Sequence, residues 1–389
     1  MARFRFLTAG ESHGKGLVLI VEGMVAGLPL EAEYINRELQ RRQRGYGRGP
    51  RMIIEKDEVE IVAGVRYGLT TGSPIALFIA NRDWRNWREA MSVAPVEKEA
   101  EPVTSPRPGH ADLAGVIKYG LKDIRPIMER ASARETAARV AAGAIARRFL
   151  EHLNILIHSH TIAIGPYRCQ QIEVNSIDWE RVEASPLRCA DEEAEKAMMA
   201  AIDEARASGD TLGGIFELIA TGVPIGLGSH VHWDRRLDGR IAQAIMSINA
   251  VKGVEIGAGF TMAEMRGSQA HDVIEPRSIE GKKEIFWRRP TNRAGGIEGG
   301  ITNGESIIVR AAVKPIATLV KALPSIDLRS GQPTIAHYER SDVCVVPAAG
   351  VIGEAMLAIV LADACMEKFG GDHLRETLSS YRNYLSNIS

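Results

Sequence analysis

Residues 129–150 read ERASARETAARVAAGAIARRFL and predict one long helix whose buried face consists of small side chains. Ser132 and Glu135 match the S-x-x-E capping box, so we expect the helix to begin after Ser132. Small or apolar residues then recur at helical spacing, namely Ala137, Val140, Ala141, Ala144 and Ile145. Another helix can approach such a smooth face closely, so we interpret it as core and not as a binding surface.

The first turn of the same helix is a candidate anion site. Arg130 and Arg134 flank this turn in the sequence. The unpaired N–H groups at a helix start attract negative charge, and guanidinium groups beside them strengthen that attraction. The alternative interpretation is an ordinary helix cap with two surface arginines.

The patterns on both sides of this helix predict an α+β protein. Strand-like alternation marks residues 16–27, 73–81, 154–165, 215–226 and 305–317. Helical periodicity marks residues 34–45, 111–121, 192–208, 239–253 and 353–369. These elements alternate without a repeated βαβ unit, which favours layers over a doubly wound sheet. Because no Ser-, Gly- or Pro-rich linker interrupts the chain, we expect residues 1–389 to form a single domain.

The composition is that of a globular protein, with 389 residues, 45% hydrophobic residues and a net charge of −1. We find no apolar run near the roughly 18 residues that span a bilayer. The first residues, MARFRFLTAGES, lack an apolar block followed by a cleavage site. We therefore expect no membrane partner and a cytoplasmic location.

The cysteine and histidine patterns give a metal site little support. Four cysteines stand far apart without a CxxC pair, as is typical of buried thiols. HSH at 158–160 and HVH at 230–232 each place two imidazoles on one strand face, as some metal sites do. Neither pair has an acidic partner motif nearby, so we expect no metal.

Six arginines gather between residues 37 and 51, which indicates a local anion site in a nearly neutral protein: Arg37, Arg41, Arg42, Arg44, Arg48 and Arg51. One alternative is a solvated helix face. A second alternative is an RNA-binding patch, but Tyr46 is the only aromatic residue there for base stacking. We therefore expect a small anionic ligand and no nucleic acid.

Four further segments carry reactive or flexible residues: GESHG at 10–14, RPGHADL at 107–113, GGIEGGITNG at 295–304 and RSDV at 340–343. The glycines of the third segment allow flat approach of the backbone to a planar or phosphorylated ligand. Arg340 and Asp342 face the same way on extended backbone, so both side chains can enter one cleft, and the alternative is an ion pair within a turn. No GxGxxG or Walker A pattern occurs, which disfavours conventional nucleotide binding.

The chain resembles the chorismate synthase family in seven motifs that follow the family order over the whole length: GESHG, RRQRGYGRG, RPGHADL, RASARET, GGIEGGITNG, KPIAT and RSDVCVVP. The last motif departs from its familiar form, because Ser341 and Val343 stand where His and Pro are usual. Arg340 and Asp342 remain in place. We therefore expect altered packing of this segment and retained function.

The resemblance implies an enzyme that converts 5-enolpyruvylshikimate 3-phosphate to chorismate and phosphate, the last common step towards the aromatic amino acids. This 1,4-anti elimination has no net redox change but requires reduced FMN. The implied fold is a β-α-β sandwich, in which a helical layer lies between two antiparallel sheets, and the implied assembly is a homotetramer. NADPH is an expected indirect reductant where the chain reduces its own FMN, and a separate flavin reductase is the alternative partner.

The resemblance also implies residue roles. His13 corresponds to the proton donor to the departing phosphate, His110 to the histidine that protonates reduced flavin, and Asp342 to the carboxylate that takes a proton from flavin N5. The implied flavin contacts are Arg130, Ala131, Ser132, Asn249, Ala250, Gly299, Lys314, Pro315, Ile316, Ala317, Thr318 and Arg340. The implied contacts to substrate or NADP are Arg42 and Arg48, with Arg107 and Arg134 as further substrate candidates.

A flavin-dependent oxidoreductase is the alternative function. It would use the same flavin-binding features while passing electrons to an acceptor. Such an enzyme would consume reduced nicotinamide in proportion to product, whereas the elimination needs only catalytic reduced flavin.

Overall fold

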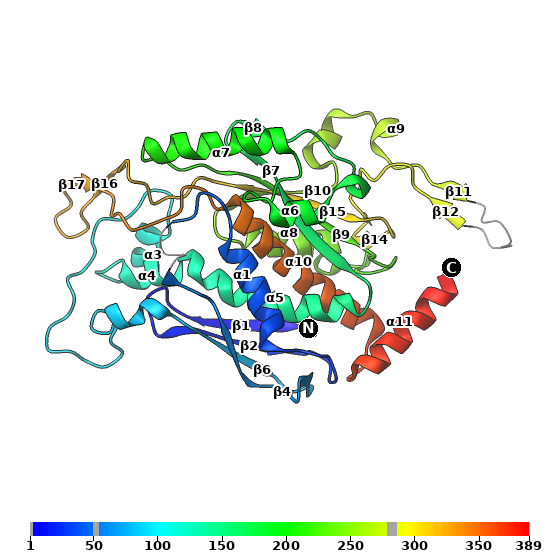
Figure 1. Cartoon of the computed structure of the whole chain (residues 1–389), viewed down its shortest axis with the longest axis horizontal. Coiled ribbons are helices and arrows are strands. Elements are labelled where there is room, and N and C mark those ends of the chain that lie inside the picture. Colours follow the sequence, from blue (N-terminus) through cyan, green and yellow to red (C-terminus); the bar gives the residue numbers. More distant parts are fainter. Residues whose placement is uncertain (1–2, 50–53, 278–285, 389) are drawn as a thin grey trace.

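The computed structural model describes residues 3–49, 54–277 and 286–388, and it shows two larger antiparallel sheets with helices packed against them (Figure 1). The four-stranded sheet has the order β1-β2-β6-β3, with bounds Arg5–Gly10, Gly16–Glu22, Ile75–Ala80 and Val59–Ala63. The five-stranded sheet has the order β10-β15-β9-β7-β8, with bounds Val251–Ile256, Ile307–Val313, Gly214–Thr221, Leu156–Ile164 and Tyr167–Arg168. This confirms the predicted α+β class with antiparallel sheets.

The remaining described elements are helices and four small hairpins. The α-helices are α1 (Ala32–Gln43), α3 (Asp112–Tyr119), α4 (Arg125–Arg130), α5 (Thr136–Glu151), α6 (Trp179–Ala184), α7 (Glu192–Ala207), α8 (Leu237–Met246), α9 (Gly267–Ala270), α10 (Val346–Phe369) and α11 (Leu374–Ile388). The 3-10 turns are η1 (Arg82–Asn86), η2 (Ala133–Glu135), η3 (Val174–Ser176), η4 (Trp233–Arg235) and η5 (Gly259–Glu264). The hairpins pair β4 (Val65–Arg66) with β5 (Leu69–Thr70), β11 (Glu275–Arg277) with β12 (Phe286–Arg288), β13 (Ile297–Glu298) with β14 (Ile301–Thr302), and β16 (Pro324–Ile326) with β17 (Pro333–Ile335).

Strand β2 shows why the four-stranded sheet has one face towards the core. Leu17, Leu19 and Val21 are buried, whereas Val18 and Ile20, which alternate with them, are exposed. Successive side chains of a strand point to opposite faces, so this register directs every second residue inwards. Helix α5 contacts β1 and β2 on this sheet.

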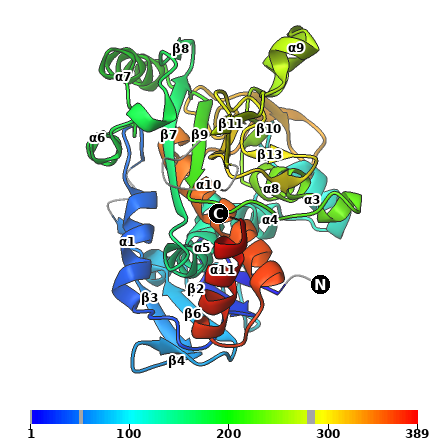
Figure 2. The same ribbon diagram turned by 90° about the vertical axis from the view of Figure 1, so that its right-hand side faces the viewer.

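Helices α5 and α10 pack against each other, and α10 also contacts β7 and β9 of the five-stranded sheet. Figures 1 and 2 show α1, α5 and α10 between the strands β2 and β6 on one side and β7 and β9 on the other. The close approach depends on Gly143 of α5, because an added Cβ there would lie 2.3 Å from the Cβ of Ala355. The small-residue face expected in this helix is therefore a helix–helix contact.

Helix α10 is also long and apolar enough to cross a membrane by length and composition, which corrects the expectation that no such run exists. The apolar stretch of this helix is entirely buried inside the protein. Gly353 of this helix faces the side chains of Phe216 and Leu218 in β9, so the helix fills the core next to the sheet. A helix that is apolar all round is typical of such a buried position.

The buried carboxylate of Glu354 in α10 collects three guanidinium groups. Arg41 of α1 donates to it at 2.8 and 3.0 Å, Arg147 of α5 at 2.5 Å and Arg188 at 3.0 Å. The hydroxyl of Ser159 donates to it at 2.5 Å. Because α1, α5, α10 and β7 all contribute, this cluster joins the helices to the five-stranded sheet.

Two of the arginines between residues 37 and 51 are turned towards the interior of the protein. Arg41 turns inwards to Glu354, and the guanidinium of Arg42 is buried. Arg51 lies outside the described residues. Arg41 and Arg42 thus pair with buried carboxylates, whereas Arg37 and Arg44 of the same segment are exposed.

Several element boundaries differ from the sequence predictions. The helix predicted at 239–253 ends at Met246, because Ala250 has a left-handed φ of +68° and β10 begins at Val251. Strands β1, β3 and β10 and helix α11 were not predicted. Helix α10 begins at Val346, before the predicted start at residue 353.

Candidate active site

A cavity of about 390 Å³ opens where the α4–α5 junction, the start of α10 and five loop segments meet. Six cationic side chains line it: Arg42, Arg48, Arg107, Arg134, Lys314 and Arg340. Apolar side chains form another part of the wall: Met128, Ile248, Ile316, Val345 and Ile352. A cavity of this volume with a cationic part and an apolar part suits an anionic small molecule that has a flat ring.

The cavity gathers most of the residues singled out from the sequence. Besides the six cations, its wall contains His110, Ala131, Ser132, Asn249, Ala250, Pro315, Ile316, Ala317, Thr318 and Asp342. His13, Arg130 and Gly299 are not among the lining residues. Gly299 lies between β13 and β14, and a Cβ added there would meet nothing within 4 Å.

The α4–α5 junction forms the wall nearest to GESHG. Ser132 caps the 3-10 turn η2 by accepting from the N–H of Arg134, and α5 begins only at Thr136. The predicted capping box is therefore wrong, since Glu135 instead accepts from Thr8 and Arg139.

Arg130 and Arg134 leave this junction in different directions. Arg130 donates to the carbonyl oxygens of Thr8 and Gly10 at the end of β1. Arg134 turns the other way and lines the cavity, where its guanidinium pairs with Asp57. Only one of the two arginines thus supports the predicted anion site.

The carboxylate of Asp57 pairs with two arginines that line the cavity. It accepts from Arg42 at 2.8 Å and from Arg134, and its own side chain is fully buried. Burial raises the pKa of Asp57, but the neighbouring Arg42 and Arg134 charges more than offset this and lower it below its usual value. The carboxylate fixes both guanidinium groups at the cavity wall.

His110 belongs to a second fixed cluster. Its Nδ1 lies 2.5 Å from Asp112, and the guanidinium of Arg107 donates twice to the same carboxylate, at 2.8 and 3.1 Å. Burial raises the pKa of Asp112, but hydrogen bonds from His110 and Arg107 lower it well below its usual value. Nδ1 faces the Asp112 carboxylate and so carries a proton, and Nε2, which lies 3.4 Å from the Arg107 guanidinium, is the ring nitrogen left to exchange one.

Asp342 is tied to the arginine-rich segment. Its carboxylate accepts from the N–H of Gly49 at 2.5 Å and pairs with Arg48 at 3.0 Å. Ser341, the unusual residue beside it, donates its hydroxyl to the carbonyl of Thr318 at 2.8 Å. The hydroxyl therefore joins RSDV to KPIAT.

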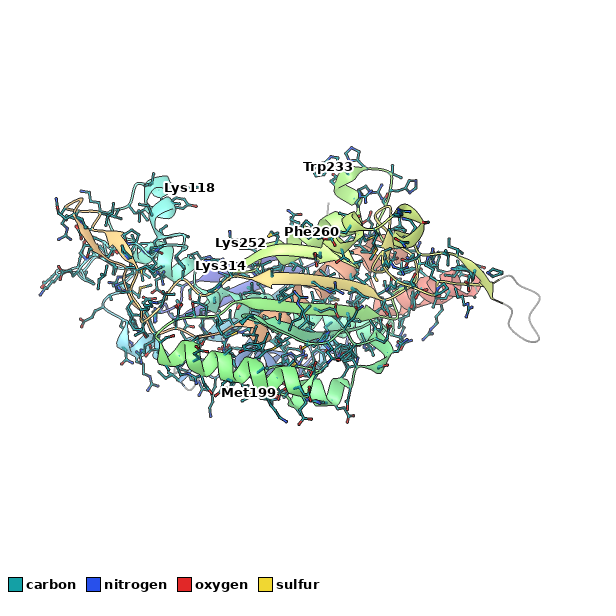
Figure 3. All side chains as sticks on the ribbon, turned by 90° about the horizontal axis from the view of Figure 1, so that it is seen from above. Lys118, Met199, Trp233, Lys252, Phe260 and Lys314 are labelled. Atoms are coloured by element: carbon teal, nitrogen blue, oxygen red, sulfur yellow. The ribbon has the colours of Figure 1, made fainter. Side chains whose placement is uncertain are left out.

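Lys314 lines the cavity, and Figure 3 labels it near Lys252. Its ammonium group donates to the carbonyl of Gly109 at 2.6 Å. Burial, with a smaller contribution from Lys252, lowers the pKa of Lys314 below its usual value. This contact joins the glycine turn next to His110 to the segment after β15.

His13 does not line the cavity, but its neighbour Ser12 contacts the lining residue Ser132. The hydroxyl of Ser132 donates to the hydroxyl of Ser12 at 3.1 Å, which places GESHG against the cavity lining. His13 itself pairs with Glu129 at 2.7 Å and stacks on Trp87 with 4.0 Å between ring centroids.

Sequence reasoning missed the acidic partners of these cations and imidazoles. Asp112 stands two residues after His110, so the RPGHADL motif contained a signal for it. Asp57 and Glu129 contact residues 77 and 116 positions away, and no local pattern marks them. Within the described residues, no group of three His, Cys, Asp or Glu side chains is placed to hold a metal ion.

Comparison with known proteins identifies the family. The chorismate synthase family model matches residues 4–366. A chorismate synthase from Moorella thermoacetica is 60% identical over 390 residues, covering 99% of this chain and 100% of the relative, and one from Desulforudis audaxviator is 56% identical with 99% and 98% covered. A crystal structure of chorismate synthase matches with a TM-score of 0.78 at 46% identity, covering 99% of this chain and 98% of the other. The chain therefore belongs to the chorismate synthase family, whose enzymes are lyases that eliminate phosphate.

Proposed function

We propose that the cavity binds 5-enolpyruvylshikimate 3-phosphate beside reduced FMN and there carries out the elimination that gives chorismate. The observation that carries this proposal is the union of six cationic side chains and an apolar wall in one cavity. The substrate has a phosphate and carboxylates, which guanidinium groups bind by charge-assisted hydrogen bonds. The family and the relatives support chorismate synthase activity and do not favour a flavin-dependent oxidoreductase.

The residues present fit a bound FMN. The cavity wall places Lys314 and Asn249 beside the apolar side chain of Ile316, which suits a flat flavin ring with an anionic phosphate. We propose that the cofactor is held by these lining residues: Ala131, Ser132, Asn249, Ala250, Arg340 and the segment 314–318. For Arg130 and Gly299, which do not line the cavity, the same role rests on the family resemblance alone. Reduced FMN, when bound, supplies reducing chemistry that the elimination requires without net oxidation of the substrate. NADPH as indirect reductant and a separate flavin reductase are alternative sources of reduced FMN.

We assign the proton-handling roles to three side chains. His110 holds its Nδ1 proton on Asp112 and presents Nε2 for transfer, as the cluster with Arg107 requires. Asp342 is the proton acceptor, held by Gly49 and Arg48 at the cavity wall. His13 is the donor to the departing phosphate.

We also propose a homotetramer of single-domain, cytoplasmic chains with the β-α-β sandwich fold. The contacts of α5 with one sheet and of α10 with the other support the sandwich. The outer face of the four-stranded sheet supports assembly, because Leu7, Val18 and Ile20 are exposed there by 73, 43 and 45%. Exposed apolar sheet faces of this kind are common at interfaces between subunits.

An anaerobic assay tests the reaction. Enzyme, substrate and a catalytic amount of dithionite-reduced FMN should give equal amounts of chorismate and phosphate over many turnovers per flavin. No reduced nicotinamide should be consumed in proportion to product. With reduced nicotinamide added as the electron source, consumption of one nicotinamide per product would instead support the oxidoreductase.

Arg48→Ala should raise the dissociation constant of the substrate while changing that of oxidised FMN less. Loss of a charge-assisted hydrogen bond of roughly 1.5–3 kcal/mol corresponds to a 10- to 150-fold change. Calorimetric titration with each ligand separately measures both constants. Arg44→Ala is the matched control, since Arg44 is exposed on the same segment and does not line the cavity. Equal weakening of both ligands would place Arg48 on the flavin side.

A further inference from the structure

His13 is held on two sides by side chains to which neither motif nor resemblance gives a role. The carboxylate of Glu129 accepts from the backbone N–H of His13 at 2.6 Å and lies 2.7 Å from its Nδ1. The ring of Trp87 stacks on the imidazole at an interplanar angle of 27°. Trp87 is itself anchored, because its indole N–H donates to Asp83 at 3.1 Å.

Glu129 is well placed to fix another residue. It lies in the last turn of α4, and its side chain is only 2% exposed. Its own backbone carbonyl accepts from the N–H of Ser12 at 3.2 Å, so it contacts two successive residues of GESHG. A carboxylate bound both to the backbone and to the ring of one residue leaves that ring little freedom to rotate.

The contacts also select a tautomer. A carboxylate accepts hydrogen bonds and has none to donate, so the ring nitrogen facing it carries the proton. In His13 that nitrogen is Nδ1. The exchangeable position that remains for chemistry is Nε2.

We propose that Glu129 is a positioning residue of the elimination. Its carboxylate holds the Nδ1 proton of the doubly protonated His13 ring, so that the second proton, on Nε2, passes to the departing phosphate and leaves a neutral ring. This inference rests on the proposed donor role of His13. Glu129 does not line the cavity and acts through the imidazole. The His110 cluster has the same arrangement with Asp112, but there Arg107 shares the carboxylate, whereas Glu129 pairs with His13.

Glu129→Gln tests this role, because it changes the group that faces Nδ1 and little else. The amide oxygen still accepts from the backbone N–H of His13, but the amide NH2 then faces Nδ1. That nitrogen must become an acceptor, so the ring is held neutral with its single proton on Nε2. The doubly protonated ring, which can give up a proton and stay neutral, is then disfavoured. Shape and volume are nearly retained, so the variant is expected to fold.

The experiment combines kinetics with spectroscopy. Single-turnover elimination is measured anaerobically with excess pre-reduced FMN for the parent, Glu129→Gln, His13→Ala and the double variant. Glu129→Gln should be roughly 10- to 100-fold slower, within the usual range for a lost orienting or proton-transfer group, and the substrate dissociation constant should stay within about threefold, as expected for a group that does not touch substrate. The double variant should be no slower than His13→Ala, because Glu129 acts only through that ring. Nitrogen-15 spectra of labelled histidine should show the His13 proton leaving Nδ1.

Glu135→Gln is the matched control, because Glu135 is a buried carboxylate nearby that contacts Thr8 and Arg139 and no histidine. It should keep the parent rate. Near-parental turnover in Glu129→Gln, or losses that multiply in the double variant, would overturn the positioning role. Normal turnover in His13→Ala would refute the donor role itself, and the nitrogen-15 spectra would then still report whether Glu129 sets the tautomer.

Discussion

Single-turnover elimination by His110→Ala should be slower than that of the parent by roughly 10²-fold or more, as expected when a positioned proton-transfer group is removed. The fold should survive, because Asp112 keeps its two hydrogen bonds from the guanidinium of Arg107 and is not left as an unpaired buried charge. The measurement uses excess pre-reduced FMN under anaerobic conditions, so that flavin reduction does not limit the rate. Binding of oxidised FMN is measured in parallel.

His337→Ala provides the control for this prediction. His337 is a partly buried imidazole near Arg107 and Glu339, and it does not line the cavity. Its removal should leave turnover within about threefold of the parent, the small effect expected away from the reacting groups. If His110→Ala, shown to be folded by circular dichroism, turned over as fast as the His337 variant, His110 would have no proton-transfer role.

Glu354→Gln should lower the free energy of unfolding by about 3–5 kcal/mol, the usual cost of breaking a buried ion pair from one side. The reason is the cluster of Arg41, Arg147 and Arg188 around this carboxylate. An amide cannot balance their charge, and its NH2 would face guanidinium donors. Denaturant melts of both proteins measure the loss. Glu38 pairs with Arg41 and Arg147, and Glu183 pairs with Arg41 and Arg188. A difference below about 1 kcal/mol, typical of surface substitutions, would show that these two carboxylates alone balance the cluster.

The pH dependence of stability gives an independent check. Burial raises the pKa of Glu354, but the three arginines outweigh burial and lower it well below the ordinary value of 4.5. A depressed folded-state pKa stabilises the protein above the unfolded-state pKa, and this contribution is lost as pH falls towards the folded-state value. Stability of the parent should therefore decrease below about pH 4.5, and Glu354→Gln should show a weaker decrease. Glu192→Gln, which removes an exposed partner of Lys196, should behave as the parent.

The sequence predicted the fold best where one residue pattern is enough. Alternating apolar residues identified β2, β6, β7, β9 and β15, and small residues at helical spacing identified α5. The pattern misled after Met246, because Ala250 is a good helix former that adopts a left-handed φ of +68° at the cavity wall. Such a conformation is imposed by neighbours, here by the strand pairing that follows, and local propensity cannot reveal it.

The residues of the candidate site likewise fall into those that the sequence revealed and those that it did not. Cationic and imidazole residues were recognised because they stand in compact motifs, and most of them line the cavity. The buried acids that orient them, Asp57 and Glu129, come from distant positions and carry no motif of their own. Partners of this kind are fixed by tertiary contacts, so they become visible only once the chain is folded.

The scattering of the cavity wall along the chain has a consequence for synthesis. The wall begins at Arg42 and is completed only by Ile352 in α10, so it draws on residues separated by most of the sequence. Contacts over such separations form late, after the entropy of closing large loops has been overcome. A nascent chain still attached to the ribosome before α10 has emerged thus has no binding site for its ligands. Neither substrate nor flavin can assist the early stages of folding, and the unfinished chain must keep its apolar sheet faces from aggregating without their help.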